Sequence, residues 1–138
     1  MAEEPLQPTD ENLMKFVFGD EVSSKRMREA MSSPAASSYN QVISPTNGPL
    51  WARRVLPVKT TVVMNLAILG CLNRPHELYT RILGLLRGGL SVEEIQEVIM
   101  HLGFYCGNPA GVEATVALHE AMENLTSRGI GYREKADS

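Results

Sequence analysis

The sequence has few cysteines, no excess of basic residues and no apolar run long enough to span a membrane. Of its 138 residues only 2 are cysteine, 13 are Lys or Arg and 16 are Asp or Glu, so the formal net charge is −3. We do not expect binding to nucleic acid, because phosphate contacts require clustered positive charge. Hydrophobic residues make up 43% of the chain, which is typical of one globular domain with its own core.

The two cysteines, Cys71 and Cys106, lie far apart in the sequence, and the first residues, MAEEPLQPTDEN, contain neither a basic nor an apolar stretch. This beginning does not match a secretory signal, so we expect a cytoplasmic protein with two reduced thiols. The longest apolar run, VVMNLAILGCL, is about half as long as a membrane span and contains Asn65. We therefore predict a buried helix there and no association with a membrane.

Apolar residues recur at helical rather than strand-like spacing, which predicts an all-α fold. Helices are expected at about 10–18, 21–31, 57–72, 75–86, 92–106 and 109–125. Ser91 and Glu94 match a capping box, in which each side chain accepts the backbone N–H of the other residue. Gly88-Gly89 is expected to end the preceding helix in a left-handed turn. Residues 32–51, rich in Ser, Pro and Asn, predict a long loop that covers a site or wraps a neighbouring molecule.

Ionisable residues gather at the start of the helix expected over 75–86. They are Arg74, His76, Glu77 and Arg81. Glu77 and Arg81 are four residues apart, so they share one face of the helix and can form an ion pair. On an exposed face such a pair contributes only about 0.3–0.5 kcal/mol. Beside the apolar helix that precedes them, the same residues can instead line a pocket with shifted pKa values, and the residues alone leave both interpretations open.

A second pair of polar residues, His101 and Tyr105, lies four residues apart on the helix that follows the capping box. A histidine in this position is more often a hydrogen-bonded core residue than a catalytic one, and we interpret His119 as structural or exposed. No His-Glu-x-x-His or paired-cysteine spacing supports a metal site, and no glycine-rich phosphate loop is present. We predict neither a bound metal nor a cofactor.

Four motifs are distinctive when they are taken together. They are FVFGDEV at 16–22, WARRVLPVKT at 51–60, NRPHEL at 73–78 and HLGFYCGNPA at 101–110. Together they resemble the carboxymuconolactone decarboxylase family over most of the chain. The resemblance implies one domain over 1–138 with an alkylhydroperoxidase-D-like bundle of about six helices. It also implies homotrimers or homohexamers with active sites near the subunit interfaces, and we expect flexible ends at 1–8 and 129–138.

The resemblance further implies a cofactor-free enzyme that decarboxylates a small lactone acid through a dienolate. The redox branch of this superfamily has Cys-x-x-Cys where this chain has Arg74 and Glu77, so disulfide-based peroxidase chemistry is excluded. The decarboxylase branch has a histidine at the position of Arg81. Because arginine stays protonated, Arg81 is expected to hold an anion and not to act as a base. The family's Lys-Thr-Arg-Ser is Lys-Thr-Thr-Val at 59–62, with loss of a cation and a hydroxyl.

These departures lead to the hypothesis of a divergent enzyme for a small carboxylated or enolisable ring substrate in aromatic or polyketide metabolism. The reaction would be a decarboxylation, isomerisation, cyclisation or dehydration. Glu77 is the expected acid/base residue, with His76 and His101 as further catalytic residues. The residues expected to bind the substrate are Arg81, Arg74, Trp51 and Tyr105. The alternatives are a catalytically silent oligomeric scaffold of the same fold, or lactone decarboxylation with His101 or His76 as the base.

Overall fold

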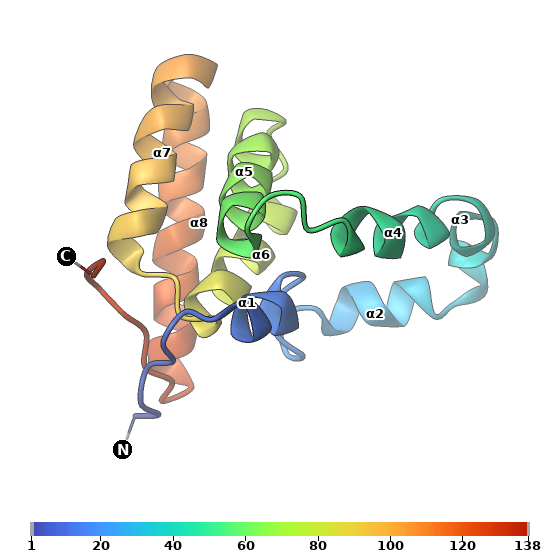
Figure 1. Cartoon of the computed structure of the whole chain (residues 1–138), viewed down its shortest axis with the longest axis horizontal. Helices are drawn as coiled ribbons and strands as arrows, with labels where there is room; N and C mark the ends of the chain where they lie inside the picture. The colour runs from blue at the N-terminus through green and yellow to red at the C-terminus, as the bar shows by residue number, and fades with distance from the viewer. Residues whose placement is uncertain (1, 138) are drawn as a thin grey trace.

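The protein is a helical bundle from which an arm of short helices projects (Figure 1). The structure, a computed structural model, describes residues 2–137. This part of the chain contains eight α-helices, two 3₁₀ helices and no strand, apart from one isolated bridge between Glu3 and Ile130. The predicted all-α fold class is therefore confirmed, with more helices than the six expected.

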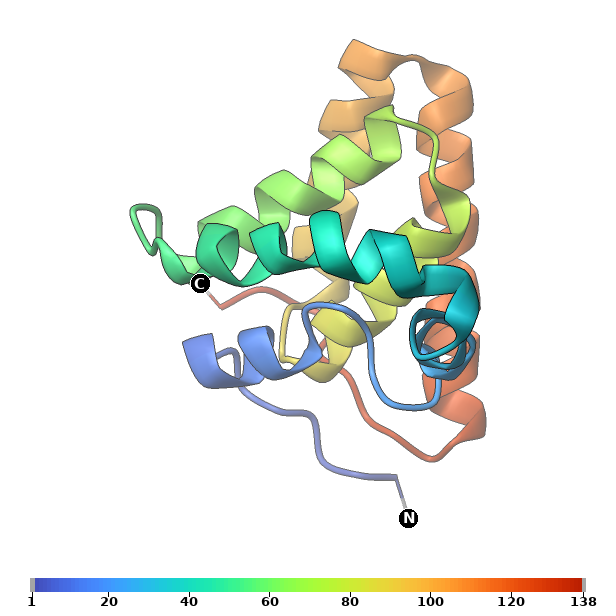
Figure 2. The ribbon, with the colours of Figure 1, turned by 90° about the vertical axis from the view of Figure 1, so that its right-hand side faces the viewer.

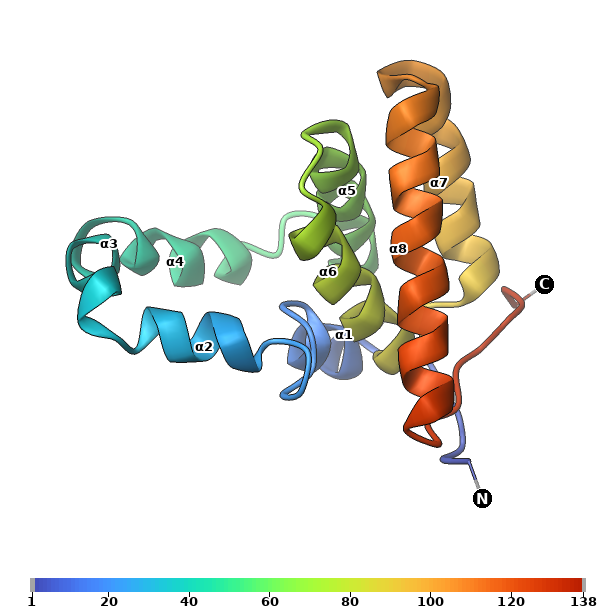
Figure 3. The ribbon, with the colours of Figure 1, turned by 180° about the vertical axis from the view of Figure 1, so that it is seen from behind.

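Four long helices form the bundle. They are α5 (Val58–Cys71), α6 (Pro75–Arg87), α7 (Val92–Cys106) and α8 (Asn108–Ser127). They make two hairpins, α5–α6 and α7–α8, whose turns lie at the same end of the bundle (Figure 3). A short helix, α1 (Asp10–Phe16), packs against α5 and α6 at the opposite end. The core is made chiefly of leucine, isoleucine and valine side chains from these five helices.

The apolar helix α5 buries one face and leaves the other exposed. Val62 and Leu66 are fully buried in the core, whereas Met64 and Ile68 are 46% and 47% exposed. The predicted buried helix is therefore buried on one face only in this single chain, because α6 and α7 cover one side of α5. None of the helices in residues 2–137 combines the length and apolarity that a membrane crossing requires.

The start of α7 has the capping box that the sequence predicts. The Ser91 hydroxyl accepts the N–H of Glu94 at 3.1 Å, and the Ser91 N–H donates to the Glu94 carboxylate at 2.9 Å. The next two N–H groups of the helix donate to the carbonyl oxygens of Arg133 and Glu134, at 2.9 and 3.0 Å. The C-terminal segment thus pairs helix N–H groups that would otherwise lack a partner.

Both ends of the chain, for which we expected flexibility at 1–8 and 129–138, make backbone hydrogen bonds. Glu3 donates its N–H to the carbonyl oxygen of Gly129 at 2.6 Å and accepts the N–H of Gly131 at 2.8 Å. Polar composition does not reveal such contacts, because backbone groups make them. For residues 1 and 138 the expectation lies outside the described residues.

Residues 25–52 form the arm, where the sequence predicted a loop over 32–51. The arm consists of α2 (Lys25–Met31), η1 (Pro34–Ala36), α3 (Ser37–Val42), η2 (Ser44–Thr46) and α4 (Asn47–Ala52). The arm leaves the bundle along α2 and returns along α4 (Figure 1). In Figure 2 the molecule is turned so that the arm faces the viewer. Pro34 and Pro45 lie in the first turns of the two 3₁₀ helices, where the missing N–H has no cost. Prolines and serines mark helix starts as well as loops, which explains the error.

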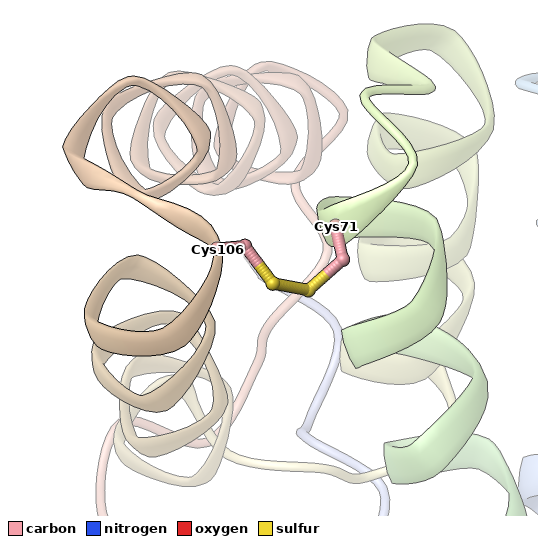
Figure 4. Close-up of a disulfide and its surroundings, with 2 residues drawn as sticks. All are labelled: Cys71 and Cys106. Atoms are coloured by element: carbon pink, nitrogen blue, oxygen red, sulfur yellow. A yellow bond between two sulfur atoms is a disulfide. The ribbon is translucent and has the colours of Figure 1, made fainter.

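Cys71 and Cys106 form a disulfide, so the predicted pair of reduced thiols is wrong (Figure 4). Each cysteine is the last residue of its helix, α5 or α7, and their Cα atoms are 5.5 Å apart. A close approach of the two helices brings them together, since a Cβ atom on Gly70 would lie 2.7 Å from a methyl group of Leu102. The sequence separation of 35 residues conceals this proximity.

Candidate functional site

Arg81, in the middle of α6, is a buried cation. The residue is only 8% exposed, and its Nε and Nη1 atoms are buried with no hydrogen-bond partner among residues 2–137. Burial lowers the pKa of Arg81 to about 10, which still leaves the guanidinium protonated at neutral pH. A charge in this setting requires an explanation, since buried polar groups in folded proteins are nearly always paired.

Two aromatic rings cover the Arg81 guanidinium. Its Cζ lies 5.0 Å from the ring centroid of Phe18 and 5.9 Å from that of Trp51, and the two rings meet edge to face at 5.8 Å. Phe18 lies in the loop after α1, whereas Trp51 belongs to α4 at the returning end of the arm. Cation–π contacts stabilise a desolvated guanidinium but leave its N–H donors free. We call these three residues and their mutual contacts the Arg81 recess, a name for the group and not for a cavity.

Two glycines allow the loop after α1 to approach α6 closely enough to place Phe18 over Arg81. A Cβ atom on Gly84 would overlap the carbonyl oxygen of Phe16. Gly19 has a φ of +91°, which a residue with a side chain rarely adopts, and a Cβ there would lie 3.1 Å from the backbone of α6. The position of the aromatic ring therefore depends on backbone contacts that only glycine permits.

The same loop binds another arginine through a carboxylate. Arg128, at the end of α8, donates from Nη1 to Asp20 at 2.6 Å, and the N–H of Ser23 donates to Asp20 at 2.9 Å. Burial would raise the pKa of Asp20, but the hydrogen bonds from Ser23 and Arg128 outweigh it and hold that pKa below its usual value. This pair is a complete, neutralised contact between the loop and α8.

Arg87 provides a comparison on α6 itself. Its guanidinium stacks on Phe16 with Cζ 5.1 Å from the ring centroid, much as Arg81 stacks on Phe18. Arg87 also binds the carboxylate of Glu3 at 3.1 Å. In the part of the chain that the structure describes, no carboxylate bonds to Nε or Nη1 of Arg81. Nε of Arg87 is also buried without a partner in residues 2–137, so the two arginines differ in their carboxylate contact and not in every donor.

Three predicted site residues, Arg74, His76 and Glu77, lie at the beginning of α6 and are exposed. Glu77 is one helical turn from Arg81, yet Nε and Nη1 of Arg81 make no bond to it or to any other residue in 2–137. The Arg81 guanidinium packs against aromatic rings instead. Of the seven predicted site residues, the structure brings Trp51 into contact with Arg81. Arg74, His76 and Glu77 lie at the N-terminal end of α6.

The remaining two predicted site residues, His101 and Tyr105, lie on the exposed side of α7. His101 Nε2 is 3.1 Å from a carboxylate oxygen of Glu97, and Tyr105 is 81% exposed with its ring against Phe104. These residues line a shallow surface hollow of about 380 Å³. The hollow is separate from the Arg81 recess in this single chain, since none of its lining residues belongs to the recess.

The sequence did not indicate Phe18 or Gly84 as parts of a site. Phe18 stands in a motif of the resemblance, but nothing in its neighbours shows that its ring covers an arginine of another helix. Lys59, also in a motif, forms an ion pair with Glu94 at the start of α7. His119 is exposed beside Glu123, as expected. Within residues 2–137, no cluster of three or more His, Cys, Asp or Glu is placed to hold a metal ion.

The fold is an all-helical bundle in which a buried arginine packs against two aromatic rings. Comparison with known proteins gives the family. Residues 39–120 match the carboxymuconolactone decarboxylase family, and this segment is more than half of the chain. The chain therefore belongs to that family, as its motifs predicted.

Two curated relatives illustrate how far this chain has diverged. A 4-carboxymuconolactone decarboxylase from Acinetobacter baylyi is 32% identical over 83 residues, which cover 60% of this chain and 60% of that protein. A nitrosuccinic acid decarboxylase from Metarhizium robertsii is 25% identical over 116 residues, which cover 83% of this chain and 80% of that protein. The match thus spans less than two thirds of the Acinetobacter protein.

Proposed function

We propose that the protein is a decarboxylase that acts on a small organic acid without a cofactor, and that Arg81 stabilises the anion formed as carbon dioxide leaves. The observation that carries this proposal is the buried guanidinium of Arg81, whose Nε and Nη1 donors have no partner in residues 2–137. An unpaired buried charge costs roughly several kcal/mol of folding free energy. Such a cost is expected where the charge has a task in binding or catalysis.

The chemistry of the recess favours a flat, unsaturated anion. A guanidinium can donate two parallel hydrogen bonds to a carboxylate, an enolate or a nitronate. The rings of Phe18 and Trp51 offer apolar surface against which an unsaturated ligand can pack. Because the Arg81 guanidinium is buried, a hydrogen bond from it to a developing negative charge is stronger than it would be at the surface.

The names of the two relatives support decarboxylation over the isomerisation, cyclisation and dehydration considered from the sequence. Nitrosuccinic acid has a carboxyl group on the carbon that bears its nitro group, and 4-carboxymuconolactone has one on an unsaturated lactone. In both compounds the electron pair of the breaking carbon–carbon bond can pass to an oxygen, which gives a nitronate or a dienolate. We infer the same feature for the substrate of this chain: a carboxylate beside an electron-accepting group.

The proposed reaction has two balanced steps. The carboxylate leaves as carbon dioxide, and its bonding electron pair moves onto the substrate oxygen that Arg81 holds. A proton then adds to a carbon of the resulting anion, which is the carbon that lost the carboxylate in a nitronate and the carbon next to the lactone carbonyl in a dienolate. Arg81 has to face the oxygen that gains charge, because holding the departing carboxylate would stabilise the ground state and slow the reaction.

Glu77 is the proposed proton donor to that carbon. It lies one turn before Arg81 on the same face of α6, and its exposure allows it to exchange protons with water. His76 is proposed to assist in this proton transfer, and Arg74 to help attract the anionic substrate. All three belong to the first turn of α6 or its N-cap, so one helix supplies the charged groups of the proposed site.

Assembly into a homotrimer or homohexamer is part of the proposal. Phe104 and Tyr105 at the end of α7 are 82% and 81% exposed, and Met100 beside them is 61% exposed. Apolar patches of this kind often mark protein–protein contacts. Docking of this face on another copy is the proposed route by which His101 and Tyr105 reach an active site. Sedimentation velocity of the full chain measures the assembled mass.

The central test is carbon dioxide release from nitrosuccinic acid and from 4-carboxymuconolactone by the wild type, Arg81→Met and Arg87→Met. Arg81→Met is expected to lower kcat about 100- to 1,000-fold, as loss of one anion-stabilising donor does in other enzymes. Arg87→Met is the matched control, because it removes a guanidinium from the same helix that Glu3 already neutralises. Equal turnover by Arg81→Met and the wild type would contradict the proposal.

Binding can be followed separately from turnover. Trp51 is the only tryptophan in the chain and packs on Arg81, so a bound acid should change its fluorescence. We expect a saturable change with either acid, and none with Arg81→Met. A change of the same size in that variant would place the binding site elsewhere.

The role of Glu77 is tested by Glu77→Gln, which keeps the shape of the side chain but removes the acid. We expect kcat to fall about 100-fold or more with little change in KM, because a general acid acts in the chemical step. Unchanged turnover would remove Glu77 from the mechanism and leave His76 as the proton donor to test next.

A catalytically silent binding or scaffold protein is the second candidate. The observation in its favour is that Glu77 is exposed and makes no bond to Nε or Nη1 of Arg81 in the described chain. The two assays separate the candidates: a scaffold would show the Trp51 fluorescence change without release of carbon dioxide, whereas the enzyme would show both.

A further inference from the structure

The disulfide between Cys71 and Cys106 lies at the end of the bundle that carries the α5–α6 and α7–α8 turns, and neither cysteine takes part in the proposed decarboxylation (Figure 4). Both cysteines are exposed, so molecules in solution can reach the bridge. Structural disulfides usually resist reduction, whereas exposed ones are more readily exchanged. A dissolved thiol can therefore reach this bond in the folded chain.

A surface hollow of about 490 Å³ opens directly beside the bond. Both cysteines line it, together with Asn73 and Pro75 at the start of α6 and Glu113 of α8. This volume is within the range of small-molecule sites. The carboxylate of Glu113 favours a ligand that carries a positive charge, and it lies in the same hollow as the two sulfur atoms.

The helices that carry the two cysteines pack closely against each other beside the bond. A Cβ atom on Gly70, next to Cys71, would lie 2.7 Å from a methyl group of Leu102, which is a buried core residue. The contact between α5 and α7 is thus part of the hydrophobic core. Reduction of the bond is not expected to separate the helices, so the same two cysteines can be oxidised again.

We propose that Cys71–Cys106 is a site of reversible exchange with a low-molecular-weight aminothiol that docks in this hollow. The thiolate of the ligand attacks one cysteine sulfur, which forms a mixed disulfide and releases the other cysteine as a thiolate. A second ligand thiolate attacks the mixed disulfide and releases the first cysteine. Both cysteine thiolates take up protons from water, and two aminothiols are oxidised to one disulfide as the protein bond is reduced.

The experiment treats the folded full chain with cysteamine or with 3-mercaptopropionate, an anionic thiol, and counts alkylated cysteines by mass spectrometry. Each rate of disulfide reduction is divided by the concentration of the thiolate form of the reagent. It is then compared with the rate for the chain unfolded in guanidinium chloride. We expect native reduction by cysteamine within about tenfold of the unfolded rate, and a preference for cysteamine that Glu113→Gln reduces at least threefold. Reduction that occurs only after unfolding would overturn the proposal, and an unchanged preference in Glu113→Gln would overturn the docking of an aminothiol.

Thermal unfolding supplies a second measurement. Opening the 35-residue cross-link is expected to lower Tm by about 10 °C, while the double variant Cys71→Ser/Cys106→Ser should show no response to thiols. Removal of the thiol and addition of cystamine should restore both Tm and the disulfide. Failure to re-form the native bond would contradict reversible exchange. None of these readouts depends on turnover, so the result is independent of the proposed decarboxylation.

Discussion

One loop of the protein meets two arginines in opposite ways. It presents the ring of Phe18 to Arg81 and, two residues later, the carboxylate of Asp20 to Arg128. The Asp20–Arg128 pair neutralises itself inside the chain and joins the loop to α8. The charge of Arg81 has aromatic contacts only, which shelter it without neutralising it. Burial of an arginine therefore does not itself indicate a structural role, because a buried guanidinium can be paired with a carboxylate or left with aromatic contacts alone.

The largest expected difference between the two arginines is in their contribution to stability. Arg128→Met should lower the free energy of unfolding by about 3–5 kcal/mol, because it leaves the Asp20 carboxylate buried without a cation. Arg81→Met should leave that free energy unchanged or raise it by about 1–2 kcal/mol, because it removes an unpaired buried charge. Urea denaturation followed by circular dichroism measures both. A similar loss of unfolding free energy in the two variants would contradict the proposed difference between Arg81 and Arg128.

Replacing Phe18 with glutamate would place a carboxylate beside Arg81, as Asp20 lies beside Arg128. In Phe18→Glu the new side chain should pair with the Arg81 guanidinium and compete with the substrate, which raises KM by about 10- to 100-fold. Phe18→Gln is the matched uncharged control and should raise KM only by the loss of the aromatic contact, about fivefold. The comparison requires steady-state kinetics on the same acid, or titration of Trp51 fluorescence. Equal effects of Glu and Gln would show that no ion pair had formed.

Gly84→Ala tests whether the close contact between α6 and the loop after α1 holds Phe18 against Arg81. The added methyl group would overlap the backbone at Phe16, so the loop must shift, at a cost of about 1–3 kcal/mol in the free energy of unfolding. The shift should also move Phe18 and raise KM. Gly48→Ala is the control, since a Cβ there has no atom within 4 Å, and it should change the stability by less than about 0.5 kcal/mol. An equally mild effect of Gly84→Ala would contradict the role of this contact.

The smallest expected effect is on the dependence of stability on pH. Asp20 has a lowered pKa in the folded chain, so its contribution is complete above its unfolded pKa of about 3.9 and is lost as the pH falls through the folded value. Glu94 behaves likewise, since hydrogen bonds from Lys59 and Ser91 outweigh the burial that would raise its pKa. The free energy of unfolding should therefore fall below about pH 4, by up to about 1.4 kcal/mol per pH unit for each group.

Asp20→Asn separates the two carboxylates. This variant should be less stable at pH 7 but lose less of its stability between pH 4 and 2, because only Glu94 then contributes the lowered pKa. Denaturation curves at several pH values check the slope. A slope identical to that of the wild type would show that Asp20 does not titrate with the unfolding equilibrium.

The sequence was most informative where local patterns decide the structure. The Ser91–Glu94 capping box, the helix over 75–87 and the all-α class follow from side-chain spacing and from hydrogen bonds between near neighbours. The sequence was least informative where contacts join distant segments. The disulfide between Cys71 and Cys106 depends on the parallel packing of two helices, which spacing along the chain does not encode.

The candidate site shows the same limit. Arg81 and Trp51 were predicted to bind substrate, and the structure places them together, but their residue types did not indicate that Phe18 completes the recess. The predicted Glu77–Arg81 pair rested on helical spacing alone. Spacing allows two side chains to meet without requiring it, and here the guanidinium packs against two aromatic rings and makes no bond to Glu77 through Nε or Nη1.

The arm, residues 25–52, can accept amino-acid substitutions with little effect on the bundle. Trp51 is carried by a segment, residues 25–52, that packs mainly on itself, whereas Phe18 is fixed to α6 through Gly84 and to α8 through Asp20. Substitutions along the arm can therefore reshape one wall of the recess while the other wall and the core keep their geometry. Under the proposed function, mutations in this segment would change substrate preference at little cost to the stability of the core.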